Sequence, residues 1–77
     1  MLNNFPHVSV KKTGRNIQRL MLEKNLSVSD IQDAMGFEYP QAIYKWFRGD
    51  CLPTVDNLIR LAILFETTIE KIVIIED

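Results

Sequence analysis

The chain has 77 residues, of which 47% are hydrophobic and 25% charged, with a net charge of −1. This suffices for one small core and leaves no room for a second domain. No stretch approaches the roughly 18 consecutive apolar residues of a membrane span, and no basic start precedes an apolar run. We therefore expect one domain, residues 1–77, in a soluble, cytoplasmic protein with no membrane partner.

The first predicted helix covers residues 14–24. Before it, residues 1–12 show no helical periodicity, and residues 8–10 alternate like a short strand. Thr13 is a suitable N-cap for the helix that follows. The inner face of this helix would carry Ile17, Leu20 and Met21, and its outer face Arg15 and Arg19.

The second predicted helix covers residues 28–35. Ser27 and Asp30 are spaced as in a capping box, with Asp in place of the usual Glu or Gln. Gly36 is expected to end the helix, because glycine readily adopts the left-handed conformation of a sharp turn. The inward side chains would be those of Ile31, Ala34 and Met35.

The third predicted helix covers residues 40–47. Pro40 suits a first helical position, because it lacks an N–H and fixes its own φ. A helix this short must bury its apolar face, so its polar face points outward. By spacing alone, an ordinary solvated face is the simpler interpretation of the polar side. The polar stripe is Gln41, Tyr44, Lys45 and Arg48, and the apolar side is Ile43, Trp46 and Phe47.

A fourth helix is predicted over residues 55–65, with Thr54 as its N-cap. Its first apolar stripe would enter the core, whereas the second is difficult for a small domain to bury. Either the core wraps widely around this helix, or a partner covers the second stripe. The first stripe is Leu58, Leu61, Ala62 and Phe65, and the second is Ile59 and Ile63.

The last part of the chain predicts a short helix and a strand. Thr67 and Glu70 are spaced like another capping box, which favours a fifth helix over residues 68–73. Residues 72–75 are strand-like and would pair either with residues 8–10 or with another subunit.

The sequence offers little support for catalysis or metal binding. His7, the only histidine, lies beside Pro6 at the start of the chain, where no regular structure is predicted for it, and a solvated side chain explains it. Cys51, the only cysteine, has no disulfide partner and no neighbour at a zinc-binding spacing. Capping and solvation account for Asp30 and Asp33. We expect no enzyme activity, no cofactor and no metal.

The net charge argues at first against a nucleic-acid partner, because phosphate affinity comes mainly from Lys and Arg. The charges are unevenly distributed, however. Residues 1–50 hold seven Lys and Arg against five Asp and Glu, whereas residues 51–77 hold two against five. Any anion-binding face therefore belongs to the first two-thirds of the chain.

Two helices joined by a short turn containing glycine, with polar side chains facing outward from the second, form the helix-turn-helix pattern. The segments LSVSDIQDAMG (26–36), IYKWFRG (43–49), LPT (52–54) and LIRLA (58–62) resemble, in this order and spacing, the lambda-repressor/Cro-like (XRE-type) DNA-binding domain. The resemblance covers about residues 13–73. It implies an all-α domain of five helices, a third helix that reads double-stranded DNA, and a sequence-specific transcriptional regulator.

The resemblance also implies roles for individual side chains. Gln41 is the first choice for reading sequence, because Gln can bond bidentately to adenine. Ser27 and the free N–H groups beside it would form a neutral anion site at the start of the second helix. Base contacts are implied for Gln41, Tyr44 and Lys45, and phosphate contacts for Ser27, Arg48, Arg15 and Arg19.

Several positions depart from the family pattern. Members usually have Gln where Val28 stands and Ala where Gln32 stands, and the turn here is one residue longer than usual. They often pair an Arg with a Glu at the positions of Met21 and Phe47. We therefore predict an apolar contact between these two side chains in place of an ion pair.

A homodimer on a two-fold operator is expected, because one short helix reads few base pairs and a dimer places two such helices about 34 Å apart. The proposed dimer surface consists of apolar groups without a predicted place in the core, namely Ile59, Ile63, Ile74 and the rest of the 72–75 tail. The alternative is an antitoxin or adaptor that holds a protein partner through the fourth helix and the tail. The acidic balance of the chain keeps that alternative open.

Overall fold

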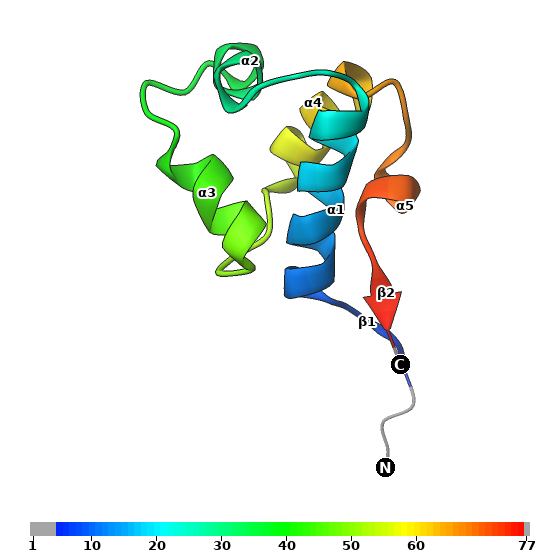
Figure 1. Ribbon diagram of the computed structural model, residues 1–77. Coiled ribbons are helices and arrows are strands. Elements are labelled where there is room, and N and C mark those ends of the chain that lie inside the picture. Colours follow the sequence, from blue (N-terminus) through cyan, green and yellow to red (C-terminus); the bar gives the residue numbers. More distant parts are fainter. Residues whose placement is uncertain (1–4, 77) are drawn as a thin grey trace.

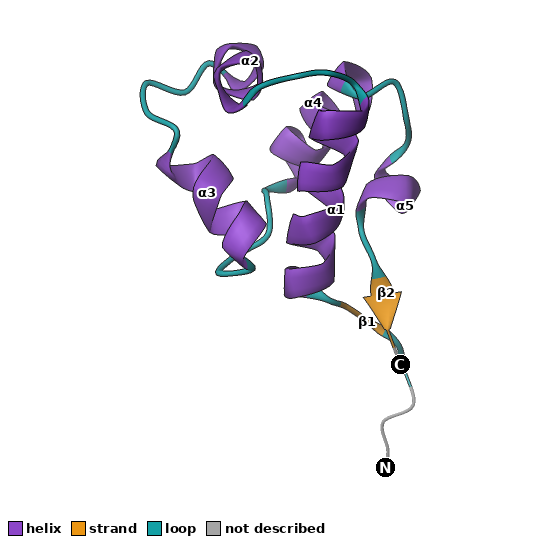
Figure 2. Ribbon diagram, viewed as in Figure 1, coloured by secondary structure: helices purple, strands orange, loops and turns teal. Residues whose placement is uncertain are grey.

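Residues 5–76, the part of the chain that the computed structural model describes, form five helices and one pair of short strands (Figures 1 and 2). This all-helical architecture with short terminal strands confirms the predicted fold class. No helix in this range is long and apolar enough to cross a membrane. In chain order the elements are β1 (His7–Val8), α1 (Val10–Glu23), α2 (Val28–Met35), α3 (Gln41–Arg48), α4 (Val55–Leu64), α5 (Ile69–Ile72) and β2 (Ile75–Glu76).

The start of α1 differs from the prediction. The helix begins at Val10, and its N-cap is Ser9, whose Oγ accepts a hydrogen bond from the Lys12 N–H at 3.2 Å. Thr13 is fully buried inside the helix, and its Oγ1 accepts from the Ile74 N–H at 2.9 Å. The prediction of Thr13 as the cap is wrong, because its hydroxyl holds the C-terminal segment instead.

Ser9, Thr13 and Asn16 form a buried polar seam along one side of α1. The Asn16 amide donates from Nδ2 to the carbonyl oxygens of Lys71, at 2.8 Å, and Ile72, at 2.9 Å. Within residues 5–76, every buried side-chain nitrogen and oxygen has a hydrogen-bond partner. The polar seam therefore fixes α5 and the segment after it against α1 without an uncompensated polar group.

The two terminal segments pair with each other, as one of the predicted alternatives requires. β1 and β2 run antiparallel, with His7 opposite Glu76, and both ends of the described chain lie together (Figure 1). The strands are shorter than predicted, because Val10 belongs to α1 and Ile72 to α5. The prediction that His7 lies outside regular structure is also wrong.

Acid should open this strand pair. The Lys12 ammonium lies 3.0 Å from a Glu76 carboxylate oxygen and lowers the pKa of Glu76, mainly through this hydrogen bond and its charge. Because the folded pKa is depressed, the stabilisation is present above the usual glutamate pKa of about 4.3 and is lost as pH falls through the folded value. Amide protection factors should drop in this acid range at Ser9, whose N–H donates to the Ile74 carbonyl oxygen at 2.8 Å, and at Glu76.

A variant separates this effect from general acid unfolding. Glu76→Gln should show weak strand protection at every pH, with no further loss below about pH 4.3. If the wild-type strands keep full protection down to pH 2 while the helices melt, the Lys12–Glu76 pair does not control the strand pairing.

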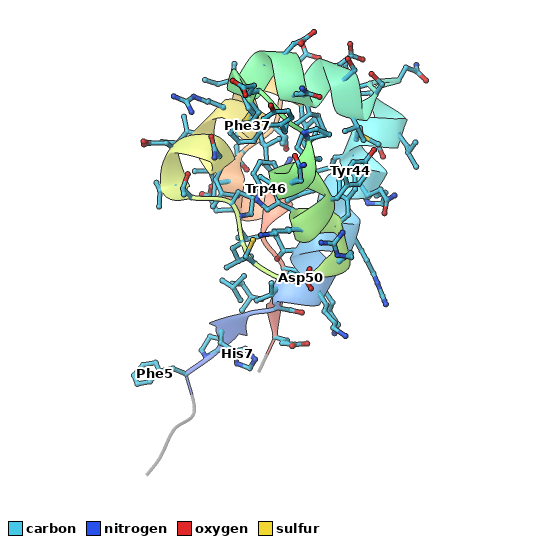
Figure 3. The ribbon with its side chains drawn as sticks, turned by 90° about the vertical axis from the view of Figure 1, so that its left-hand side faces the viewer. Phe5, His7, Phe37, Tyr44, Trp46 and Asp50 are labelled. Atoms are coloured by element: carbon cyan, nitrogen blue, oxygen red, sulfur yellow. The ribbon has the colours of Figure 1, made fainter. Side chains whose placement is uncertain are left out.

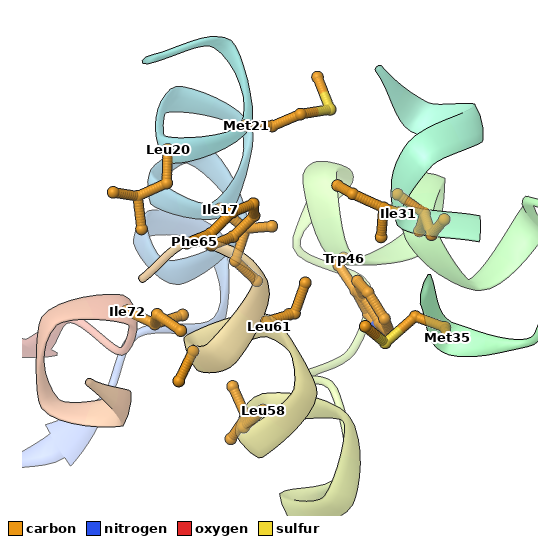
Figure 4. Close-up of a cluster of buried hydrophobic side chains, with 12 residues drawn as sticks. Ile17, Leu20, Met21, Ile31, Met35, Trp46, Leu58, Leu61, Phe65 and Ile72 are labelled. Atoms are coloured by element: carbon orange, nitrogen blue, oxygen red, sulfur yellow. The ribbon is translucent and has the colours of Figure 1, made fainter. Parts of the chain in front are cut away.

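The core lies between α1 and α4, with α2 and α3 closing one side and α5 the other (Figure 4). The predicted inner face of α1 and the first stripe of α4 are buried, which confirms both. Ala34 is exposed, so its predicted inward position is wrong. It lies beside the narrow stripe with which α2 contacts α4. The buried apolar side chains are Ile17, Leu20, Met21, Ile31, Met35, Ile43, Trp46, Leu58, Leu61, Ala62, Phe65 and Ile72.

The remaining helix ends follow their predicted signals in part. Thr54 caps α4, because its Oγ1 accepts from the Asn57 N–H at 3.3 Å. α4 ends at Leu64, one residue before the predicted end. The capping box predicted for the fifth helix is wrong, since Thr68 is the N-cap of α5 and its side chain makes no capping hydrogen bond.

Candidate nucleic-acid interface

α3 presents its polar stripe to solvent, as predicted. Ile43 and Trp46 are buried, whereas the side chains on the opposite side are all exposed. Pro40 is the N-cap rather than the first helical residue, so α3 is shifted by one residue from the predicted 40–47. The exposed stripe consists of Gln41, Tyr44, Lys45 and Arg48.

A close backbone approach between α1 and α3 fixes the position of this stripe. A Cβ atom on Gly14 would lie 1.8 Å from the carbonyl oxygen of Trp46, so only glycine fits there. The sequence placed Gly14 at the start of a helix and gave no sign of this role. It allows the C-terminal end of α3 to lie directly on α1.

Lys11 extends the exposed stripe beyond the end of α3. Gly49 adopts a φ of 76°, and a Cβ there would lie 2.6 Å from Lys11 Cγ. The Lys11 side chain therefore crosses the backbone that follows α3, and it is exposed. Sequence reasoning missed Lys11, because the helix was expected to begin at residue 14. The available signal was Ser9, a residue type strongly preferred as an N-cap. We call Lys11 and the four exposed α3 side chains the α3 face.

The Tyr44 ring is held in place although the residue is 45% exposed. It packs edge-on against Phe47, with 6.1 Å between ring centroids and 84° between planes. Phe47 is half-buried against the core that contains Met21. The predicted direct contact between Met21 and Phe47 stays a prediction. Figure 3 looks onto α3 and shows Tyr44 on this side of the molecule.

Arg48 is partly neutralised by a neighbour. Its Nε donates to Asp50 Oδ2 at 2.9 Å, and both side chains are more than half exposed. An exposed ion pair of this kind contributes about 0–1 kcal/mol. A phosphate can therefore compete with Asp50 for the guanidinium, and the phosphate contact predicted for Arg48 stays a prediction.

The start of α2 has the predicted capping box. Ser27 Oγ accepts from the Asp30 N–H at 3.1 Å, and Asp30 Oδ2 accepts from the Ser27 N–H at 2.8 Å. The Ser27 hydroxyl proton remains available to a phosphate. The Asp30 carboxylate beside it makes this end of α2 a poorer anion site than its N–H groups alone would make, and the Ser27 contact stays a prediction.

The two arginines predicted on the outer face of α1 differ in their surroundings. Arg15 is exposed one turn after Lys11 and lies on the same side of α1. Arg19 donates to Asn16 Oδ1 from Nε at 3.1 Å and to Glu23 from Nη1 at 2.8 Å. These bonds direct it toward α5, where it lines a groove of about 290 Å³. Arg19 is therefore not brought together with the α3 face.

The second stripe of α4 is exposed, as the sequence indicated. Ile63 is 73% exposed, and Ile59 and Val55 lie on the same side of the helix. Ile74 is half-buried, and its backbone N–H and C=O are bonded to the polar seam. The prediction that Ile72 is an apolar group outside the core is wrong, because it is fully buried.

The helix-turn-helix family model HTH_3 matches residues 17–72. Solved structures that share the fold include the restriction-modification controller protein C.AhdI from Aeromonas hydrophila, with a TM-score of 0.72 and 19% identity over 82% of this chain and 94% of that one. The DNA-binding domain of BldD has a TM-score of 0.70 and 18% identity over 86% and 94%. The S. venezuelae BldD DNA-binding domain has the same TM-score and identity over 86% and 97%. No curated protein matches the chain in sequence.

Proposed function

The chain belongs to the XRE-type helix-turn-helix family, and on that premise we propose that it is a cytoplasmic, sequence-specific DNA-binding transcriptional regulator. The observation that carries this proposal is the α3 face. It is an exposed row of hydrogen-bond donors and cations on a helix whose other side is buried. α3 would enter the major groove, as the second helix of this motif does.

The side chains of the α3 face would divide the work of binding. Gln41 reads a base, adenine by preference, and Tyr44 approaches a base edge beside it. Lys45 reaches a base edge and also an adjacent phosphate, so its charge contributes to binding of every duplex. Lys11 and Arg48 contact phosphates at the C-terminal end of α3 and position the protein without reading sequence. Arg15, on the same side of α1 as Lys11, and Ser27, the N-cap of α2, would add weaker phosphate contacts.

Two alanine variants test this division of roles. Gln41→Ala should relax preference at one base pair by about 1–3 kcal/mol, with weak binding to unrelated duplexes unchanged. Lys45→Ala should weaken binding to all duplexes similarly and reduce the slope of log K against log salt by about 0.9. Titration of labelled duplexes at several salt concentrations measures both effects. Equal effects from the two substitutions would refute the assignment of roles.

The regulator is proposed to act as a homodimer through the exposed row of α4, formed by Val55, Ile59 and Ile63. Exposed apolar patches of this kind mark interaction sites. Ile63→Glu should yield a monomer in sedimentation equilibrium, because a carboxylate would enter the apolar contact. Leu22→Glu, the same change at a residue 64% exposed on α1, is the control and should keep the dimer mass. An unchanged mass for Ile63→Glu removes this surface from consideration.

A protein partner is the second candidate, and the same α4 row favours it. In an antitoxin or adaptor, this row would hold another protein while the α3 face stays free. The two functions are compatible, since they use different surfaces. They are separated by salt dependence. Duplex binding that neither falls steeply with salt nor distinguishes sequences would exclude the regulator and leave the partner-binding role.

A further inference from the structure

The two helices of the helix-turn-helix are joined more by their connection than by mutual packing. α3 packs chiefly against α1, whereas α2 packs chiefly against α4, and Figure 1 shows the two helices at separate corners of the molecule. The segment 36–40 between them therefore has to set the position of the start of α3 relative to α2.

One side chain ties this segment to α2. Gln32 Nε2 donates to the carbonyl oxygens of Glu38, at 3.1 Å, and Phe37, at 3.4 Å. Outside the helices and strands of residues 5–76, no backbone N–H donates to either carbonyl. The Gln32 carbonyl oxygen also accepts from the Phe37 N–H at 3.0 Å. Gln32 thus holds the connection through both its backbone and its side chain.

The same segment is fixed on its other side by an aromatic contact. The Phe37 ring packs edge-on against Trp46, with 5.9 Å between centroids (Figure 3). Trp46 belongs to α3 and is buried. Phe37 therefore links the connection to the inner side of α3, while Gln32 links it to α2. The two links together leave little freedom for the residues that lead into Gln41.

We propose that Gln32 is a positioning residue for DNA recognition. Its amide fixes Phe37 and Glu38, and through them the start of α3, so that Gln41 meets a base at a set distance from the phosphate contacts. This inference rests on the proposed function. A reading side chain has to be held within about 0.5 Å by neighbouring groups, and Gln41 lies three residues after the tied carbonyl of Glu38.

The test is Gln32→Met, which keeps the length of the side chain and removes its donor. Affinity for the selected duplex should fall on the order of tenfold, which is the size of effect expected when the hydrogen bonds of one side-chain amide are lost. Affinity for unrelated duplexes and the salt slope should stay unchanged, since no phosphate contact is lost. Gln18→Met is the matched control. It makes the same change at an exposed position of α1.

A second readout keeps the failure of this inference distinct from failure of the proposed function. Backbone 15N relaxation of free Gln32→Met should show increased motion confined to residues 37–41, with an unchanged melting temperature. This result would show that Gln32 fixes the start of α3 even if the wild-type chain binds no duplex, in which case the proposed function fails and the local restraint by Gln32 stands. Wild-type relaxation and wild-type specificity in Gln32→Met would overturn the inference. So would equal losses on selected and unrelated duplexes, which indicate a general weakening of binding.

Discussion

Replacing Gly14 by alanine is expected to lower the free energy of unfolding by about 3 kcal/mol. The new methyl group would lie 1.8 Å from the Trp46 carbonyl oxygen and 2.9 Å from its carbon. Both are backbone atoms of α3, so no side chain can rotate to relieve the clash. Alanine inside a helix normally gains about 1 kcal/mol over glycine, but α1 and α3 would have to separate to accommodate it. Urea denaturation measures the loss.

Gly36→Ala is the matched control, because it separates crowding from backbone conformation. Gly36 has a φ of 71°, and a Cβ there would meet nothing within 4 Å. Its cost is therefore that of a left-handed alanine alone, about 1–2 kcal/mol. A Gly14→Ala protein with the wild-type unfolding midpoint would show that α1 and α3 do not lie in backbone contact.

The Lys11→Glu variant is expected to lower affinity for every duplex by 10- to 100-fold at about 0.1 M salt. The change removes a proposed phosphate contact next to Gly49 and places a negative charge beside the DNA. Lys11 is the second residue of α1, and an acidic side chain at this position interacts favourably with the helix dipole. The fold should therefore keep its stability, and weaker binding will not result from unfolding. Binding isotherms and thermal melts of the same samples measure both quantities.

Lys71→Glu makes the same charge change on α5, which lies on the other side of α1 from α3 (Figure 1). It should weaken binding by only a few fold, because charges more than about 10 Å away are screened at this salt. Similar losses in the two variants would mean that net charge, rather than the α3 face, governs binding.

Local signals predicted most of the helix-turn-helix. The capping box of Ser27 and Asp30, the glycine at the end of α2 and the periodicity of α3 each depend on residues a few positions apart. Such interactions form within one helix and are readable from the chain alone. The α3 stripe, which holds most of the candidate site, followed from the same periodicity.

The errors arose where distant residues decide the outcome. Ser9 and Thr13 are both acceptable caps, and the choice between them depends on the Ile74 N–H, 61 residues from Thr13. Lys11 belongs to the candidate site only because α1 begins at Val10, which places the Lys11 side chain against Gly49. No local pattern specifies such contacts between elements.

The remaining site features also depend on tertiary contacts. Arg19, for which a phosphate contact is predicted, bonds to Asn16, whose amide donates to the carbonyl oxygens of Lys71 and Ile72 at the end of α5. Gln32 stood out in the sequence only as an unusual residue for its position. Its hydrogen bonds to the segment before α3 could not be predicted without knowing the path of that segment in the structure.

The most direct test of DNA recognition by α3 is selection of bound duplexes from a random pool. The expected result is a two-fold symmetric motif with half-sites about 34 Å apart, each containing an adenine whose preference disappears with Gln41→Ala. An unenriched pool, or a motif that Gln41→Ala leaves unchanged, would contradict the proposal that α3 reads DNA.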